Sequence, residues 1–162
     1  MRKSIVILLF YTFILISRIM FAQTLKLGFS IEPSFISYER MDGSSISFVP
    51  FSADLKILVA PINWLNIETR PGIFIGSTDY MWVELGGYVR FNLLPSRFYI
   101  IAGVNDHIKG GHDDLLYNGV GIGFQKDSRL SFDLIYYWKN GVREDKLNGI
   151  LKLGFGFSKD IL

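Results

Sequence analysis

Residues 80–93 read YMWVELGGYVRFNL, and the alternation within this stretch decides the fold. The apolar side chains occupy one face at every second position, namely Met81, Val83, Leu85, Val89, Phe91 and Leu93. The opposite face carries Glu84, Gly86, Tyr88, Arg90 and Asn92. Period two is the periodicity of a β-strand. The stretch therefore predicts a strand that separates an apolar environment from a polar one.

Seven further runs show the same alternation and are rich in β-branched and aromatic residues. They are 24–31, 48–59, 64–76, 98–106, 115–125, 130–138 and 147–158. Three of the links are four-residue turns, at 60–63, 94–97 and 126–129, and they alternate with links at 32–47, 77–79, 107–114 and 139–146. Links this short join antiparallel neighbours, so we expect an up-and-down meander of eight strands with both termini at one end.

One proline disturbs this pattern. Pro71 lies inside the run 64–76, where it cannot donate a hydrogen bond to a neighbouring strand. It predicts a β-bulge or a break in that strand.

Eight strands can close into a barrel with either face inside, and the polar face decides between the two. Its charged residues are Lys26, Asp54, Lys56, Glu68, Arg70, Glu84, Arg90, Asp133 and Lys152, with Glu32 just beyond the first strand. Five positive charges thus meet five negative ones, as an enclosed interior requires, because an unpaired charge there is costly. Glycines on this face leave room for long side chains in a narrow lumen. A soluble lipocalin-like ligand-binding barrel, with the apolar face inside, is the alternative.

Aromatic residues add weight to a membrane barrel because they lie towards the strand ends, as the girdles at membrane interfaces do. They are Trp64, Tyr80, Trp82, Phe98, Tyr99, Tyr136, Tyr137, Trp138, Phe155 and Phe157. We therefore predict an all-β, eight-stranded antiparallel up-and-down transmembrane β-barrel with the charge ladder inside.

The first 22 residues predict a secretory signal peptide, with Arg2 and Lys3 before the apolar stretch 5–16 and Ala22 at the cleavage site. An uncleaved membrane anchor is the alternative. The barrel domain then spans 23–162, which is 162 − 22 = 140 residues, and loss of Arg2, Lys3 and Arg18 changes the net charge to +2 − 3 = −1. This charge gives no support for nucleic-acid binding.

Two absences in the sequence exclude further classes of protein. The chain has no cysteine, which excludes a disulfide scaffold, a thiolate metal site, a catalytic thiol and a lipoprotein anchor. No apolar run of about 18 residues follows Ala22, which excludes a bundle of transmembrane helices.

The chain resembles the bacterial outer-membrane β-barrels of the small OmpA/OmpX type. Three stretches carry the resemblance: the export signal ending in Phe21-Ala22-Gln23, the glycine-spaced strand 119–124 and the last strand 151–157. The resemblance implies a bacterial outer-membrane location in a Gram-negative cell envelope. It also implies contact with outer-membrane lipid and with the barrel-assembly machinery, which reads a terminal aromatic residue; here the last aromatic residue is Phe157 and the chain ends at Leu162.

The loop 107–114 and the strand end before it hold the one cluster that resembles a site. His107, His112 and Asp113 are weak candidates for a metal site or a general base, against the simpler interpretation of a solvated polar turn. Lipid-modifying enzymes of small outer-membrane barrels use a histidine with a serine near the outer rim. No serine follows either histidine closely, so no catalytic residue is carried over.

The functional expectation is a non-enzymatic outer-membrane barrel without a cofactor, acting in surface interaction or envelope integrity. An eight-stranded interior is too narrow for a wide porin-like pore. The alternatives are a narrow ion path along the charge ladder, and a lipid-modifying enzyme that uses a loop histidine. The link 32–47, with Phe35, Ile36, Tyr38 and Met41, is expected to extend the first hairpin and to offer a surface to a partner not identified by the sequence.

Overall fold

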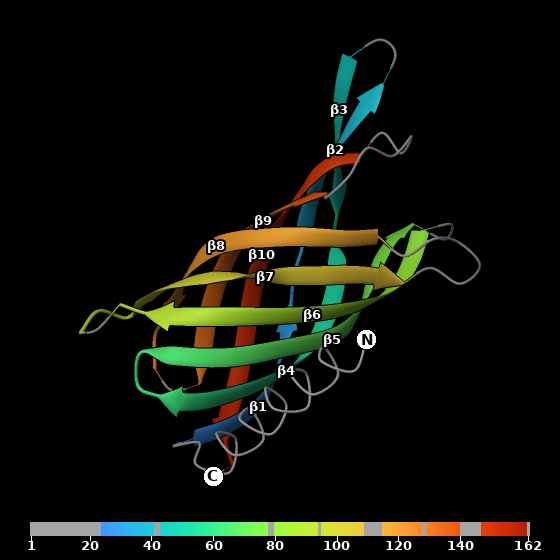
Figure 1. Ribbon diagram of the computed structural model, residues 1–162. Coiled ribbons are helices and arrows are strands. Elements are labelled where there is room, and N and C mark those ends of the chain that lie inside the picture. Colours follow the sequence, from blue (N-terminus) through green and yellow to red (C-terminus); the bar gives the residue numbers. More distant parts are fainter. Residues whose placement is uncertain are drawn as a thin grey trace, which may run out of the picture.

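A computed structural model (Figure 1) describes residues 24–40, 43–77, 80–93, 95–108, 115–127, 129–139 and 147–161. The predicted signal peptide, His112 and Asp113 lie outside the described residues. Within those ranges, no helix is long and apolar enough to cross a membrane. The strands are β1 (Thr24–Ile31), β2 (Ser34–Arg40), β3 (Gly43–Val49), β4 (Phe51–Ile62), β5 (Leu65–Ser77), β6 (Tyr80–Asn92), β7 (Phe98–Ile108), β8 (Leu115–Gln125), β9 (Leu130–Lys139) and β10 (Leu147–Asp160).

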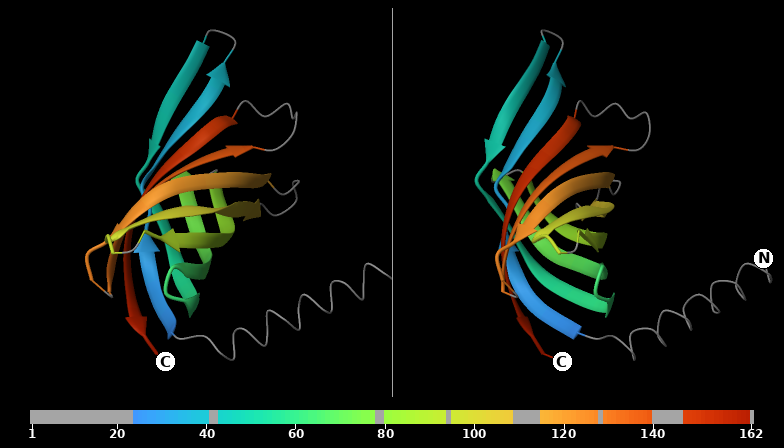
Figure 2. Two further views of the ribbon diagram at one scale, coloured as in Figure 1. Left: turned by 60° about the vertical axis from the view of Figure 1, so that its left-hand side comes forward. Right: turned by 90° about the vertical axis from the view of Figure 1, so that its left-hand side faces the viewer.

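These strands form one closed antiparallel barrel. The order is β1-β4-β5-β6-β7-β8-β9-β10-β2-β3, and the pairing of β1 with β10 closes the ring. Strands β1 and β2 are two parts of one broken strand, and so are β3 and β4, so the ten segments make eight barrel strands. Lys26 pairs with Asp160, which brings the start of β1 and the end of β10 to one end of the barrel (Figure 2). The predicted eight-stranded up-and-down barrel is confirmed.

The link 32–47 extends the first hairpin, as expected, and most of it forms the paired strands β2 and β3 instead of an irregular loop. Pro33 and Pro50 separate these strands from β1 and β4, since neither residue has an amide hydrogen to donate. The backbone remains joined around the break, where Glu32 N donates to Ser52 O at 2.8 Å and Leu153 N donates to Pro33 O at 2.9 Å. The β2–β3 hairpin projects from the end of the barrel opposite the start of β1 and the end of β10 (Figure 1).

The predicted bulge at Pro71 is also wrong. The pairs Asp54 with Gly72 and Ile57 with Thr69 keep the same register on either side of it, and Pro71 itself pairs with Leu85 of β6. A missing amide hydrogen removes a single ladder bond, whereas a bulge requires an extra residue in one strand. Strand β5 therefore accommodates the proline without a shift in register.

The apolar face of the strands points outward. Leu85 is 49% exposed, whereas its neighbour Glu84 is 1% exposed. The same outward band includes Phe29, Leu55, Val89, Phe91, Ile122, Phe132 and Phe155. An apolar exterior around a polar interior excludes the soluble lipocalin-like alternative, whose exterior would be polar.

The aromatic girdle is only partly as expected. Six of its predicted members are exposed on the outer surface: Trp64, Phe98, Tyr136, Trp138, Phe155 and Phe157. Tyr99 and Tyr137 are buried in the lumen instead, because each occupies an inward position of its strand. The side chains of Tyr80 and Trp82 are outside the described part.

Candidate functional site

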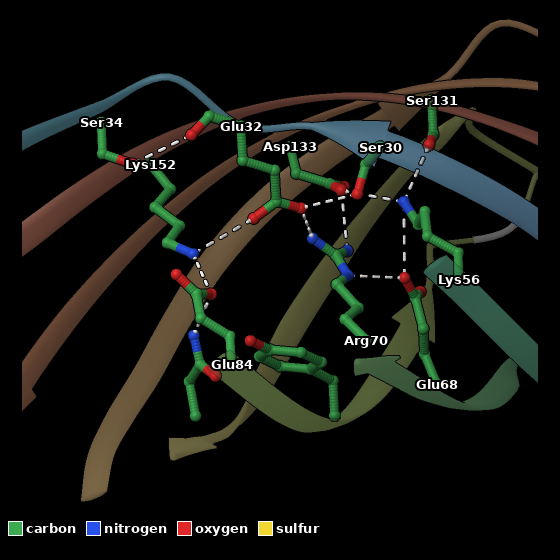
Figure 3. A network of polar contacts seen from close by, with 12 residues as sticks. Ser30, Glu32, Ser34, Lys56, Glu68, Arg70, Glu84, Ser131, Asp133 and Lys152 are labelled. Atoms are coloured by element: carbon green, nitrogen blue, oxygen red, sulfur yellow. Dashed lines mark hydrogen bonds and ion pairs between the residues drawn. The ribbon is translucent and has the colours of Figure 1, made fainter. Parts of the chain in front are cut away.

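The centre of the lumen is a network of ion pairs around Arg70 (Figure 3). The Arg70 guanidinium donates to Glu68 Oε1 at 2.7 Å, to Glu32 Oε1 at 2.6 Å and to Asp133 Oδ2 at 2.7 Å. Glu32 follows β1, Glu68 shares β5 with Arg70, and Asp133 lies on β9. One side chain thus connects strands on opposite sides of the barrel. Arginine can bind several carboxylates at once because its planar guanidinium carries five N–H donors in fixed directions, which the lysine ammonium lacks.

Lys56 and Arg90 extend this central network. Lys56 Nζ lies 3.2 Å from Asp133 Oδ2 and 3.4 Å from Glu68 Oε1, and it donates to Ser131 Oγ at 3.2 Å. Arg90 Nη1 donates to Glu68 Oε2 at 3.1 Å. Glu68 therefore meets three cations.

A second cluster lies nearer the hairpin end of the lumen. Lys152 Nζ donates to Glu84 Oε2 and lies 3.8 Å from Glu32 Oε2, which links the two clusters. Asn105 Nδ2 donates to the same Glu84 oxygen at 2.9 Å, and His107 Nε2 lies 3.6 Å from Glu84 Oε1. Glu84 is thus contacted from β7 and from β10.

The remaining two members of the charge ladder have different surroundings. Lys26 lies at the terminus end, where its ammonium is 3.0 Å from Asp160 Oδ1. Asp54 is buried in the lumen, and neither of its carboxylate oxygens accepts a hydrogen bond from a described residue.

Tyrosine side chains complete the interior, and the sequence pattern had placed two of them, Tyr99 and Tyr137, in the outer girdle. Tyr99 donates to Asp133 Oδ1, and the hydroxyls of Tyr88 and Tyr137 lie 2.8 Å apart. Tyr99 lies on the same strand face as Asn105, and Tyr137 lies on the same face as Asp133, which indicates inward positions. Their location near the strand ends indicated a membrane girdle instead. Glu32 lies just beyond the first strand, as predicted, and is fully buried in the network.

Of the three candidates in the loop 107–114, the structure describes only His107, while His112 and Asp113 lie outside the described residues. His107 belongs to β7 and is 1% exposed, with its ring 5.6 Å from that of Phe74 and 4.8 Å from that of Tyr117. It is a lumen residue, and the solvated-turn interpretation does not hold for it. Among the described residues, no group of three or more His, Cys, Asp or Glu side chains could hold a metal ion.

The packing of these side chains closes the middle of the barrel. Arg70, Glu68 and Glu32 are each 1% exposed, although they lie at the lumen centre. Side chains lining a water-filled pore would be accessible to water. The described interior therefore contains no wide passage at this level.

The β2–β3 hairpin is the second candidate site. Strand β3 pairs with β2 along its whole length, from the pair of Ser34 with Val49 to the pair of Arg40 with Gly43. Within the described residues, no other strand pairs with β3. Ile46 is 74% exposed, and Phe48 is exposed while its ring contacts that of Phe35 at 5.1 Å. The hairpin thus carries an open strand edge with apolar side chains on one face.

Comparison with known proteins identifies the fold and not the activity. The crystal structure of Neisserial surface protein A (NspA) matches with a TM-score of 0.53 and 16% identity, over 83% of this chain and 95% of that chain. The chain has the fold of a small outer-membrane β-barrel. A structure from the de novo design of transmembrane β-barrels matches with a TM-score of 0.50 and 14% identity, over 86% of this chain and 97% of that one. No protein-family model matches the sequence, and no curated protein matches it.

Proposed function

We propose that the protein is a non-enzymatic integral protein of the bacterial outer membrane, exported by a signal peptide cleaved after Ala22, that presents the β2–β3 hairpin to an external protein partner. The open edge of β3 is the observation that carries this proposal. The likeness in fold to a protein named as a surface protein of Neisseria is consistent with it.

Strand length supports projection of the hairpin above the membrane. A tilted transmembrane strand needs about 9–11 residues to cross the hydrocarbon core. Strands β7 and β9 have 11 and 10 residues, which is enough to cross and little more. The broken first strand runs from Thr24 to Arg40, so β2 extends beyond the length that the membrane requires.

The edge of β3 supports a partner that binds as an added strand. Unpaired amide and carbonyl groups of an exposed edge can form a ladder with an extended peptide, and neighbouring side chains then select the sequence. Ile46 and Phe48 project from the same face of β3 and supply an apolar surface for that selection. We therefore expect the partner to contribute an extended segment with apolar residues at alternate positions.

The interior gives no support to the lipid-modifying enzyme. His107 is enclosed in the lumen beside Glu84, where a membrane lipid cannot reach it. The closed centre likewise favours an anchoring role for the barrel body over transport.

Membrane residence is tested by expressing the full chain with its N-terminal segment and separating the cell envelope. The expected result is a protein in the outer-membrane fraction that migrates differently on gels before and after boiling, with Gln23 as its first residue. Recovery as a soluble periplasmic protein would contradict the proposal.

The role of the hairpin is tested by surface plasmon resonance of the full chain in lipid nanodiscs against a panel of extracellular proteins. We expect a binder whose affinity falls about tenfold in Ile46→Lys, because a charge then replaces an apolar contact. Ser47→Lys is the matched control, since it adds the same charge to the opposite face of β3. Equal binding by Ile46→Lys and the unmodified chain, or no binder at all, would overturn the proposal.

A further inference from the structure

We propose that the barrel mouth at the terminus end binds a compact anion of carboxylate or phosphate chemistry. A cavity of about 190 Å³ opens there, far from the β2–β3 hairpin. Its lining includes two cations and four side-chain amides, namely Lys26, Arg90, Asn63, Asn66, Asn92 and Gln125, and it includes no Asp or Glu. A cavity lined by positive charge and amide groups favours an anion over a cation.

Arg90 is the central element of this site. It is 2% exposed, and its guanidinium is held by Glu68 Oε2 and Gln125 Oε1, each at 3.1 Å. The ring of Tyr99 lies 3.7 Å from the guanidinium carbon and restricts its orientation. Arg90 Nε has no acceptor among the described residues. Arg90 therefore gives the cavity wall a buried and oriented positive charge with an N–H donor to spare, and charge-assisted hydrogen bonds to an oxyanion are strong.

The amides beside Arg90 are ordered by contacts with one another. Asn66 Nδ2 donates to Asn92 Oδ1 at 3.4 Å, and Asn92 Nδ2 donates to the backbone oxygen of Asn63 at 2.9 Å. These contacts tie the lining of the cavity to the β4–β5 turn. A ligand therefore meets side chains that are already positioned, which lowers the entropic cost of binding.

Charges around the mouth have the sign that attracts an anion. Four exposed basic residues belong to this end of the barrel: Arg97, Lys126, Arg129 and Lys159. The exposed acidic residues of the same described segments are Asp127 and Asp160. The excess of positive charge raises the local concentration of anions at the entrance.

The volume limits the ligand to a small group. The cavity is several times the ~30 Å³ that one water occupies in the liquid. It fits a free carboxylate or phosphate compound of a few heavy atoms, and it equally fits the phosphate headgroup of an anionic lipid. The two sources share the same oxyanion chemistry and differ in whether an acyl chain tethers the anion to the membrane.

The test is a titration of the full chain, in an uncharged detergent, with sodium phosphate and in parallel with sodium chloride at equal ionic strength. The side-chain Nε–H resonance of Arg90 is followed by NMR. We expect a saturable shift with phosphate that chloride does not reproduce. Gln125→Glu places a carboxylate beside Arg90, and we expect it to weaken phosphate binding about tenfold or more. The same result is expected for Asn92→Asp, which serves if Gln125→Glu does not fold.

Lys126→Gln is the control, because it removes a neighbouring charge outside the cavity and should change the affinity less than about threefold. Absence of a saturable phosphate shift in the unmodified chain, or undiminished binding by a folded Gln125→Glu or Asn92→Asp variant, would overturn the proposal. Repeating the measurement in nanodiscs with and without phosphatidylglycerol separates the sources. A shift that needs only the anionic lipid indicates a headgroup, and one that needs added phosphate indicates a free anion.

Discussion

Arg70 and Asp54 show two ways in which an ionisable residue is held in a narrow lumen. Arg70 contacts carboxylates from three parts of the chain, so its charge is compensated on every side. Asp54 is buried as deeply without a hydrogen-bond donor among the described residues. Removing one partner from a buried network leaves the others uncompensated, whereas replacing a carboxyl that has no hydrogen-bond donor does not. The two kinds of site should therefore respond differently to the same chemical change.

Glu68→Gln and Asp54→Asn both convert a carboxylate to an amide of the same shape. We expect Glu68→Gln to lower the free energy of unfolding by about 3–5 kcal/mol, because Arg70, Lys56 and Arg90 then lose a shared counter-ion. Asp54→Asn should change it by less than about 1 kcal/mol in either direction. Urea unfolding of the full chain in lipid vesicles, followed by tryptophan fluorescence, measures both. Equal losses in the two variants would contradict this account.

At the scale of the element, glycines in β8 provide the space that the interior tyrosines occupy. Gly119 faces the lumen, and a Cβ atom there would lie 2.7 Å from Tyr137 Cε1 and 3.4 Å from Ile135 Cγ2. Gly87 of β6 faces outward and has nothing within 4 Å of a Cβ position. Glycine is therefore needed for side-chain packing at position 119, whereas a larger residue fits at position 87.

Gly119→Ala should destabilise the barrel by about 1–3 kcal/mol, because Tyr137 is fully buried and cannot withdraw. Gly87→Ala should be neutral, or stabilising by about 0.5–1 kcal/mol, since alanine loses less backbone entropy in a strand. The same unfolding assay in vesicles compares them. Destabilisation by Gly87→Ala equal to that of Gly119→Ala would show that the steric argument is wrong.

The short turn between β8 and β9 depends on the charge of Asp127. Leu130 N and Arg129 N donate to Asp127 Oδ1 at 2.8 and 2.7 Å, and these hydrogen bonds lower the pKa of its carboxyl below the usual 3.8. A lowered pKa in the folded protein means that the carboxylate stabilises the turn fully above pH 3.8. This contribution is lost as the pH falls through the lowered pKa.

We expect the amide proton shifts of Leu130 and Arg129 to titrate together, with a midpoint below pH 3.8. In Asp127→Asn the turn keeps an acceptor oxygen, and this titration should disappear. An NMR titration in detergent micelles checks both statements. A midpoint above pH 3.8 in the unmodified chain would refute the role assigned to Asp127.

At the scale of the whole molecule, the two ends and the middle of the barrel have different properties. The hairpin end presents an open strand edge, the terminus end has a polar cavity, and the side chains between them are almost fully buried. The middle therefore separates the two ends, and each end is expected to act independently of the other.

This separation predicts that the reconstituted protein conducts no steady ionic current. Planar bilayer recordings in potassium chloride should show no single-channel steps, because the Arg70 network occupies the lumen centre. An established porin, reconstituted in the same way, is the positive control. Reproducible steps from purified full-length protein would mean that the lumen opens.

The alternation in residues 80–93 was sufficient to predict a strand with opposite faces, and repeated runs were sufficient to predict eight strands and their order. Period two is a local property, since successive side chains point to opposite sides of any strand. The equal numbers of positive and negative charges on the polar face likewise indicated which face lies inside. The breaks at Pro33 and Pro50 were missed, because a proline within a polar stretch signals a turn as readily as an interrupted strand.

What the sequence by itself determined is therefore the barrel, its strand order and the residue types that its lumen contains. Only the tertiary structure decided that Arg70 joins Glu32 to Asp133, that His107 is enclosed beside Glu84, that Tyr99 and Tyr137 turn inward, and that Arg90 lines a cavity. The physical reason is that the strand pattern is set by neighbours two residues apart. Contacts across a closed barrel instead depend on the register of all eight strands at once.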